Sequence, residues 1–221
     1  MSFLTGLLTS KKPFATGGTA HFEELNVSEW EGEGKFAIVV HNVFSADECT
    51  ELIARSEAKG YEAALLNIGG GRQVEALAVR RSKRTIIDDP ALAEEMWSRI
   101  IQATSEDPRL MQRMSPRLAH AMASKKESSG GGGAPIEPSH HAVGLNERLR
   151  FLKYEAGDYF SPHSDGCYVR RGEAGPERRG ECSMVTCQLY LNEGFEGGAT
   201  RFMDFNDETK VTTRCTTRGF Q

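Results

Sequence analysis

The sequence lacks three features that would indicate particular classes of protein. No apolar run approaches the roughly 20 residues that a membrane-spanning helix needs. Basic residues do not outnumber acidic ones, at 27 against 31, and the five cysteines are odd in number and irregularly spaced. These absences argue against a membrane protein, a general nucleic-acid binder and a disulfide framework. Reduced thiols in the cytoplasm or nucleus are the simpler interpretation, although the acid-free residues 1–20 leave an organelle transit peptide open.

A length of 221 residues predicts a single domain, here over residues 35–221, preceded by an N-terminal tail or peripheral segment over 1–34. Glycine, serine and proline dominate residues 124–141 and predict a flexible loop inside that domain. His140 and His141 lie in this loop. A solvated pair is the simpler interpretation of these two histidines, and a metal-binding pair stays open.

Local signals predict two helices among short strands. The apolar, β-branched run 36–44 predicts a buried strand. Ser45 with Glu48 forms a capping box, which predicts a helix that ends at Gly60. Short strands are expected over 61–87, and Pro90 after two aspartates predicts the start of a second helix.

From residue 148 onward the sequence pattern becomes typical of β-strands. Residues 148–154 and 183–192 alternate between apolar and polar positions, and two glycines open a further strand over 197–205. Alternation in 183–192 places apolar side chains on one face and hydroxyls and amides on the other. The apolar face carries Ser183, Val185, Cys187, Leu189 and Leu191, and the polar face carries Met184, Thr186, Gln188, Tyr190 and Asn192.

His163 and Asp165 are the first candidates for chemistry. In an extended segment, residues two apart point to the same side, so this imidazole and carboxylate can share one metal ion. With a second histidine from a distant strand they would make the ligand set of non-haem Fe(II) oxygenases. Taken alone, the pair also fits a surface histidine beside an aspartate.

The context of this pair resembles a known family. Residues 145–154 and 157–165, then TCQLYLN at 186–192 and GGATRF at 197–202, are similar to the prolyl 4-hydroxylase-like Fe(II)/2-oxoglutarate-dependent dioxygenases. The upstream segments FSADECTELI, GYEAA and RRSKRTIIDDPALAEEMWSRI fit as well. The resemblance covers roughly residues 36–205 without the glycine-rich loop. The ordered set of motifs is more specific than any single piece.

The resemblance implies an α+β fold, a double-stranded β-helix (jelly-roll) with supporting helices on one side. It implies that His163 and Asp165 are iron ligands, and that Tyr154 and Tyr190 reach 2-oxoglutarate, although core packing is the alternative for both tyrosines. Fe(II), 2-oxoglutarate as co-substrate and ascorbate as reductant follow by resemblance. So does hydroxylation of a C–H bond, with a prolyl residue of a protein or peptide as the expected target.

One departure from the family pattern stands out. No histidine follows His163, whereas the relatives supply a third ligand from a later strand, followed by an Arg or Lys that pairs with the distal carboxylate of 2-oxoglutarate. Arg214 and Arg218 are not preceded by a histidine at a matching place. We therefore expect a C-terminally truncated domain, with its last strands missing, weak metal binding and little turnover.

Three further interpretations stay open. The chain could be a catalytically inactive fragment or isoform that acts only by binding partners. A zinc-stabilised module is another, with His163, Cys167, Cys182 and Cys187 as ligands. The loop 167–182 reads most simply as solvated, although the relatives close this loop over a peptide, which leaves a role with acidic substrates open. Its arginines are Arg170, Arg171, Arg178 and Arg179.

Overall fold

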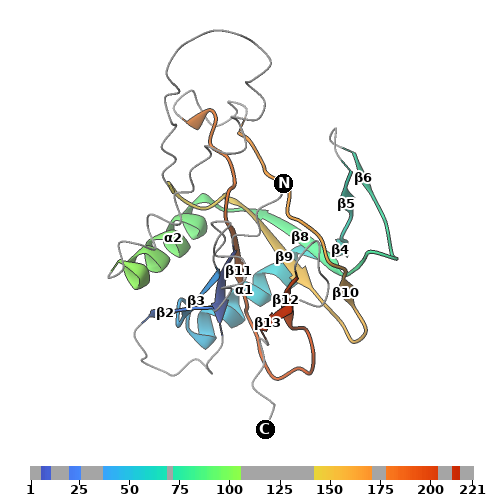
Figure 1. Ribbon diagram of the computed structural model, residues 1–221, viewed down its shortest axis with the longest axis horizontal. Helices are drawn as coiled ribbons and strands as arrows, with labels where there is room; N and C mark the ends of the chain where they lie inside the picture. Colours follow the sequence, from blue (N-terminus) through green and yellow to red (C-terminus); the bar gives the residue numbers. More distant parts are fainter. Residues whose placement is uncertain are drawn as a thin grey trace.

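The computed structural model describes residues 6–10, 20–25, 37–68, 72–105, 142–170, 178–203 and 211–214. Within them the fold is α+β, with two helices and several small, mostly antiparallel sheets, and these residues form no closed barrel (Figure 1). The elements are β1 Gly6–Ser10, β2 His21–Glu24, β3 Ala37–His41, α1 Ala46–Lys59, β4 Glu62–Ala63, β5 Leu66–Asn67, β6 Gln73–Val74, β7 Arg80–Arg81, β8 Lys83–Asp88, α2 Pro90–Thr104, β9 Arg148–Lys153, β10 Tyr159–Phe160, β11 Thr186–Leu189, β12 Thr200–Met203 and β13 Val211–Arg214.

The largest sheet has the order β11-β1-β3-β2. All five residues of β3 are buried, as the apolar run predicted. The strand β2 lies at the edge of this sheet, and β1 does not. That strand pairs in parallel with both β3 and β11 and so lies inside the sheet.

Both helices begin where the sequence predicts. The Ser45 hydroxyl accepts a hydrogen bond from the Glu48 N–H at 3.2 Å, and the Glu48 carboxylate accepts one from the Ser45 N–H at 2.6 Å. The helix α1 ends at Gly60, whose φ of +84° favours glycine. The Asp89 carboxylate accepts a hydrogen bond from the Leu92 N–H at 2.9 Å and caps α2.

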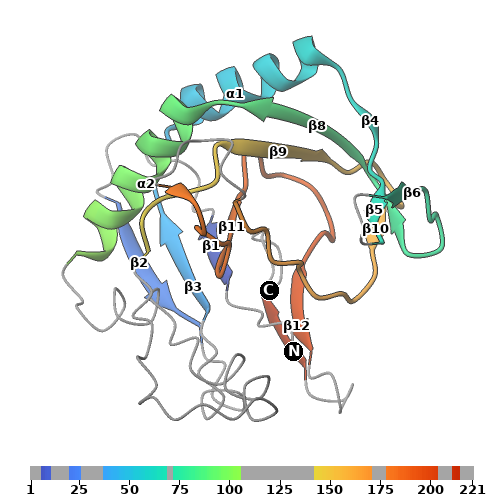
Figure 2. The same cartoon turned by 90° about the horizontal axis from the view of Figure 1, so that it is seen from above.

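The antiparallel pair of β8 and β9 separates two environments. Figure 2 shows α1 running along the outer side of β8, with β9 and most other strands on the inner side. Leu149 and Phe151 of β9 pack against the core that the helices and β3 form, and Ile87 of β8 is buried. Because side chains alternate along a strand, Arg84 and Arg150 lie on the opposite, inner face.

The predicted alternation of residues 183–192 is confirmed on its apolar side. Val185, Cys187, Leu189 and Leu191 all pack against the core cluster of the helices. Beyond this strand, β12 pairs with β13 in antiparallel register. Gly198 precedes β12 with a φ of +66°, and a Cβ at this position would lie 2.9 Å from the Phe195 ring. A side chain is therefore excluded there by both backbone and space.

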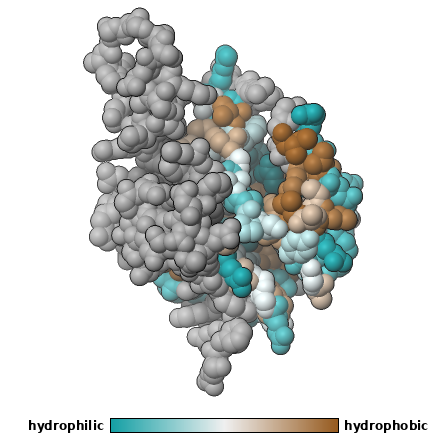
Figure 3. Space-filling model, turned by 45° about the vertical axis from the view of Figure 1, so that its right-hand side comes forward, coloured by the Kyte–Doolittle hydropathy of each residue, from teal (hydrophilic) through white to brown (hydrophobic). Residues whose placement is uncertain are grey.

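Apolar side chains are exposed around the β5–β6 hairpin and the segment that follows it. Figure 3 brings this side of the molecule forward and shows the brown patch. The exposed apolar residues of the hairpin and of the segment after it include Ile68, Val74, Leu77 and Val79. Neither helix in the described parts of the chain has the length and apolar character needed to cross a membrane. The predicted loop over 124–141, with His140 and His141, lies entirely outside the described residues, which exclude 106–141.

Candidate metal centre

His163 and Asp165 follow β10, and a short ladder and ring stacking fix their position. The strand β10 pairs with β7, and the Ser161 N–H then donates a hydrogen bond to the Val79 carbonyl at 2.8 Å. The His163 ring stacks on that of Phe160, with centroids 3.5 Å apart and planes inclined by 18°. The Arg80 guanidinium lies 4.4 Å from the centroid of the same Phe160 ring. The segment that carries the two candidate ligands is thus tied to β7.

The structure brings the two predicted ligands together. The Nε2 atom of His163 lies 3.5 Å from Oδ1 of Asp165. The Nδ1 atom of the imidazole lies 2.8 Å from the Ser161 carbonyl, which can only accept, so Nδ1 carries the proton and donates. In a neutral imidazole, Nε2 then keeps its lone pair on the side of the carboxylate.

Asp165 is held from a second strand. The Thr186 hydroxyl at the start of β11 donates a hydrogen bond to Oδ2 of Asp165 at 2.6 Å. The other carboxylate oxygen, Oδ1, is the one that faces His163. This hydrogen bond joins two segments 21 residues apart and fixes the carboxylate by an atom that a metal would not need.

Electrostatics shift the pKa values of the pair in opposite directions. The hydrogen bond with Asp165 raises the pKa of His163 above its ordinary value of 6.5, against the opposing effect of burial. The same contact with His163, together with the Thr186 hydroxyl, lowers the pKa of Asp165. At neutral pH the carboxylate is therefore ionised, while protonation of the imidazole competes with any metal.

The two candidate co-substrate tyrosines lie in different environments. Tyr190 packs against the second core cluster of Leu25, Ala37, Val39 and Phe202, and its hydroxyl lies 2.6 Å from that of Thr200. Burial raises the pKa of Tyr190, and the phenol of Tyr154 adds to this effect, which shows that the two phenols lie within electrostatic reach. Tyr154 is 46% exposed. Packing thus accounts for the ring of Tyr190, while the hydroxyls stay polar groups near one another.

The four described cysteines do not gather into one cluster. Cys187 packs against the helical core, and burial raises the pKa of its thiol to about 12, which disfavours the thiolate that zinc binds. Cys167 is exposed, and its thiol donates a hydrogen bond to the Tyr168 carbonyl at 3.7 Å. Burial raises the pKa of the Cys182 thiol, and Cys167 adds to this effect. Among the described residues, no three His, Cys, Asp or Glu side chains lie together as a metal site.

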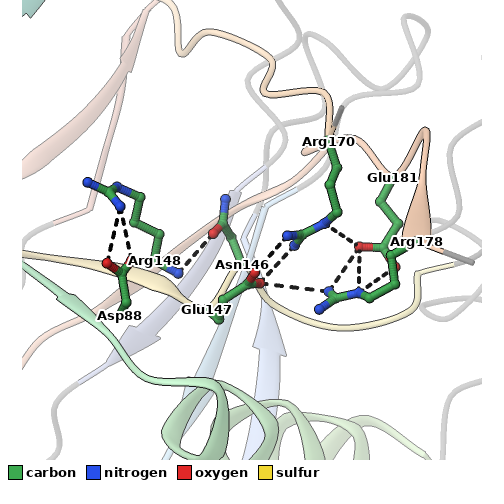
Figure 4. A network of polar contacts seen from close by, with 7 residues as sticks. All are labelled: Asp88, Asn146, Glu147, Arg148, Arg170, Arg178 and Glu181. Carbon is green, nitrogen blue, oxygen red and sulfur yellow. Dashed lines mark hydrogen bonds and ion pairs between the residues drawn. The ribbon is translucent and has the colours of Figure 1, made fainter. Parts of the chain in front are cut away.

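The arginine-rich loop is not simply a solvated one. Figure 4 shows Arg170 and Arg178 directed at the carboxylates of Glu147 and Glu181. Arg170 is 7% exposed and donates two hydrogen bonds to Glu147, at 2.6 and 2.8 Å, and one to Glu181 at 3.0 Å. The expectation of a solvated loop is therefore wrong for Arg170, because its guanidinium is buried against two acids. Arg179 is exposed, and Arg171 lies outside the described residues.

Sequence reasoning did not single out Thr186 as a support of Asp165, nor Arg84 and Arg150 as neighbours of the site. Thr186 was on the predicted polar face, which was the one available signal. The positive charge of Arg150 helps to lower the pKa of Asp165, which places that guanidinium near the carboxylate. The register of β8 against β9, which brings Arg84 to the same place, cannot be read from either strand alone.

No family model, curated protein or solved structure matches this chain. An interpretation of the site therefore rests on the donor atoms themselves. The structure supplies one imidazole nitrogen and one carboxylate oxygen that face each other, each oriented by a hydrogen bond through its other polar atom.

Proposed function

We propose that this chain is an Fe(II)- and 2-oxoglutarate-dependent dioxygenase of the prolyl 4-hydroxylase-like type, built on a jelly-roll. Its reaction is hydroxylation of a C–H bond, and its target is a prolyl residue of a protein or peptide. The observation that carries the proposal is the pairing of His163 Nε2 with Asp165 Oδ1 at 3.5 Å. The resemblance of residues 36–205 to that family supplies the chemistry.

The donor set fits a divalent iron. Imidazole and carboxylate are two of the three ligands of the facial site that leaves positions open for a co-substrate. Two ligands with metal bonds of ~2.1 Å at a right angle lie about 3 Å apart, close to the observed spacing. The remaining polar atoms, Nδ1 of His163 and Oδ2 of Asp165, are hydrogen-bonded to Ser161 and Thr186 as outer partners of metal ligands are.

Each residue of the site has a role in this proposal. His163 and Asp165 would hold the iron, which together with 2-oxoglutarate and oxygen supplies the oxidising power for hydroxylation, with release of succinate and carbon dioxide. Tyr154 and Tyr190 would donate hydrogen bonds to the co-substrate. Thr186 and Ser161 keep the two ligands oriented before the metal arrives, so little reorganisation accompanies binding. Ascorbate is the expected reductant.

Metal binding is the first test. Titration calorimetry with Mn(II), under conditions free of oxygen chemistry, should give weak 1:1 binding, since the described residues offer two ligands. Asp165→Ala should abolish the heat of binding, while Asp47→Asn, an exposed carboxylate in the first turn of α1, should leave it unchanged. Equal binding by all three proteins would remove His163 and Asp165 as the metal centre.

Turnover is the second test. Purified protein with Fe(II), ascorbate and oxygen should form succinate from 2-oxoglutarate slowly, and a proline-containing peptide should accelerate it. His163→Ala should abolish the signal. Succinate formation that survives this substitution would come from another centre and would contradict the proposed chemistry.

A further inference from the structure

Two arginines lie side by side on the inner face of the β8–β9 pair. The register pairs Arg84 with Leu152 and Ile86 with Arg150, so Arg84 and Arg150 occupy diagonal positions on one face. Such diagonal neighbours are within reach of each other when the side chains are long. As whole residues, Arg150 is exposed and Arg84 is partly buried, so the pair lies at the surface of the described part of the chain.

Neither guanidinium has an ion-pair partner among the described residues. Within the described parts of the chain, Arg84 donates only to the Gln73 side chain at 3.4 Å, and Arg150 only to the Arg148 carbonyl at 3.4 Å. Glu62 is opposite Arg84 in the ladder, but no ion pair forms between them. Four neighbouring cations are paired: Arg81 with Asp158, Lys83 with Glu155, Arg148 with Asp88 and Lys153 with Glu57. Arg80 instead donates a hydrogen bond to the Ser82 hydroxyl at 2.9 Å.

The surroundings of the two arginines carry excess positive charge. Burial and the charges of Arg80 and Arg148 lower the pKa of Arg84, and Glu62 opposes them. Burial and the charges of Arg84 and Arg148 lower the pKa of Arg150, while Asp165 and Asp88 oppose them. Two like charges with no carboxylate at ion-pair distance among the described residues repel each other and gain stability when an anion binds between them.

This cluster adjoins the candidate metal centre. The strand β8, which carries Arg84, directly follows β7, and β7 pairs with β10, the strand that leads to His163 and Asp165. Arg80 of β7 contacts the Phe160 ring on which His163 stacks. A ligand that reaches from the two arginines to His163 and Asp165 therefore needs an anionic group at the arginines and its reacting carbon at the proposed metal.

We propose that Arg84 and Arg150 bind the carboxylate of an acidic residue that neighbours the target residue in a peptide substrate. The inference rests on the proposed function for the identity of the target and names its substrate class. A guanidinium binds carboxylates through two parallel hydrogen bonds, and two such forks on one face suit an acidic side chain presented from solvent. Because Arg150 is an exposed residue, it is better placed to bind a carboxylate of the peptide substrate than a carboxylate of 2-oxoglutarate enclosed beside the metal.

The test is peptide binding to the metal-free protein, which separates this site from the iron chemistry. The probes are a blocked, fluorescein-labelled nine-residue peptide with a central proline flanked by two glutamates, and the same peptide with two glutamines. Fluorescence anisotropy should show about 10- to 100-fold tighter binding of the glutamate peptide, the range for one or two charge-assisted hydrogen bonds. Equal affinity of the wild-type protein for both peptides would overturn the proposal.

Variants locate the effect. Arg84→Gln and Arg150→Gln should each remove most of the preference for glutamate, and Arg150→Lys should keep part of it. The matched control is Lys153→Gln, on the same strand but the opposite face, with the same change of charge. Binding at these two arginines is contradicted if the preference for the glutamate peptide persists when Arg84→Gln and Arg150→Gln are combined. It is also contradicted if Lys153→Gln removes the preference equally.

A last arm separates the substrate from the co-substrate. Titration of the Mn(II)-loaded protein with 2-oxoglutarate should give the same affinity for the wild type and Arg150→Gln. If the variant instead loses 2-oxoglutarate and keeps its preference for glutamate, the arginines serve the co-substrate and the proposed substrate class is wrong. Failure of the metal titration alone would overturn the dioxygenase proposal and leave the anisotropy result standing.

Discussion

Two groups of arginines in this protein differ in what faces them. Arg170 and Arg178 meet the carboxylates of Glu147 and Glu181 at hydrogen-bond distances, and Arg170 is almost fully buried. Arg84 and Arg150, on the inner face of β8 and β9, have no carboxylate at ion-pair distance among the described residues. The guanidiniums of the first group are neutralised by carboxylates of the protein. Those of the second group are not, so their positive charge can bind an anionic ligand.

The difference shows that the number of arginines in a sequence segment does not tell which of them are available to bind an anion. The loop 167–182 has the denser arginine pattern in the sequence, which leaves a role with acidic substrates open beside the simpler interpretation of a solvated loop. Arg170 and Arg178 instead pair with Glu147, in the segment before β9. Bidentate, partly buried pairs of this kind fix the geometry of the segments that they join, so Arg170 and Arg178 are better described as a clamp on the segment before β9 than as an anion site.

The largest expected effect comes from breaking the clamp. Glu147→Gln leaves the buried Arg170 guanidinium without its bidentate carboxylate and should cost about 3 kcal/mol of unfolding free energy. Urea denaturation followed by circular dichroism measures it. Glu155→Gln breaks an exposed pair with Lys83 and should cost less than about 0.5 kcal/mol. Similar losses in the two variants would show that burial of Arg170 does not matter.

The clamp also predicts how stability depends on pH. Arg170 lowers the pKa of Glu147 from 4.5 to about 2, so the stabilisation is complete above pH 4.5 and is lost as the pH falls toward 2. A shift of this size corresponds to about 3 kcal/mol. The stability difference between the wild type and Glu147→Gln should therefore be constant from pH 5 to about 8 and shrink below pH 4.5. A difference that stays constant down to pH 3 contradicts the ion pair.

A smaller effect is expected at the outer member of the clamp. Arg178 bonds to Glu181 through its Nε and Nη2 atoms, but Arg170 also serves both acids, so the carboxylates keep a partner when Arg178 is removed. Arg178→Gln should cost about 1 kcal/mol, measured by the same urea titration. A loss equal to that of Glu147→Gln would mean that the four residues act as one inseparable unit.

Local signals account for the parts of the fold that the sequence predicted. The capping residues Ser45, Glu48 and Asp89 act within three positions of themselves, so both helix starts could be predicted. The alternation of residues 183–192 likewise follows from one strand alone. The strand β1 could not be predicted, because its partners β3 and β11 are remote and Gly6–Ser10 carries no alternating pattern.

The site divides in the same way. His163 and Asp165 are two positions apart, and their meeting follows from extended backbone. The contacts made by more remote residues do not follow from local backbone geometry. Thr186 lies 21 residues from Asp165, and Arg170 lies 23 residues from Glu147. The juxtaposition of Arg84 and Arg150 needs the register of two strands separated by α2 and the residues that follow it. Pairing over such distances is decided by tertiary packing, which no local pattern reports.

The smallest expected change in unfolding free energy is a gain and not a loss, and it tests the contrast between the two groups of arginines most directly. Because Arg84 and Arg150 repel each other and lack a carboxylate partner among the described residues, Arg150→Gln should leave stability unchanged or raise it by about 0.5 kcal/mol. The gain should fade in 1 M NaCl, where the screening length falls to about 3 Å. Urea titrations at low and high salt measure both. A loss of about 1 kcal/mol or more would reveal a structural partner for Arg150, and the two groups of arginines would then be alike.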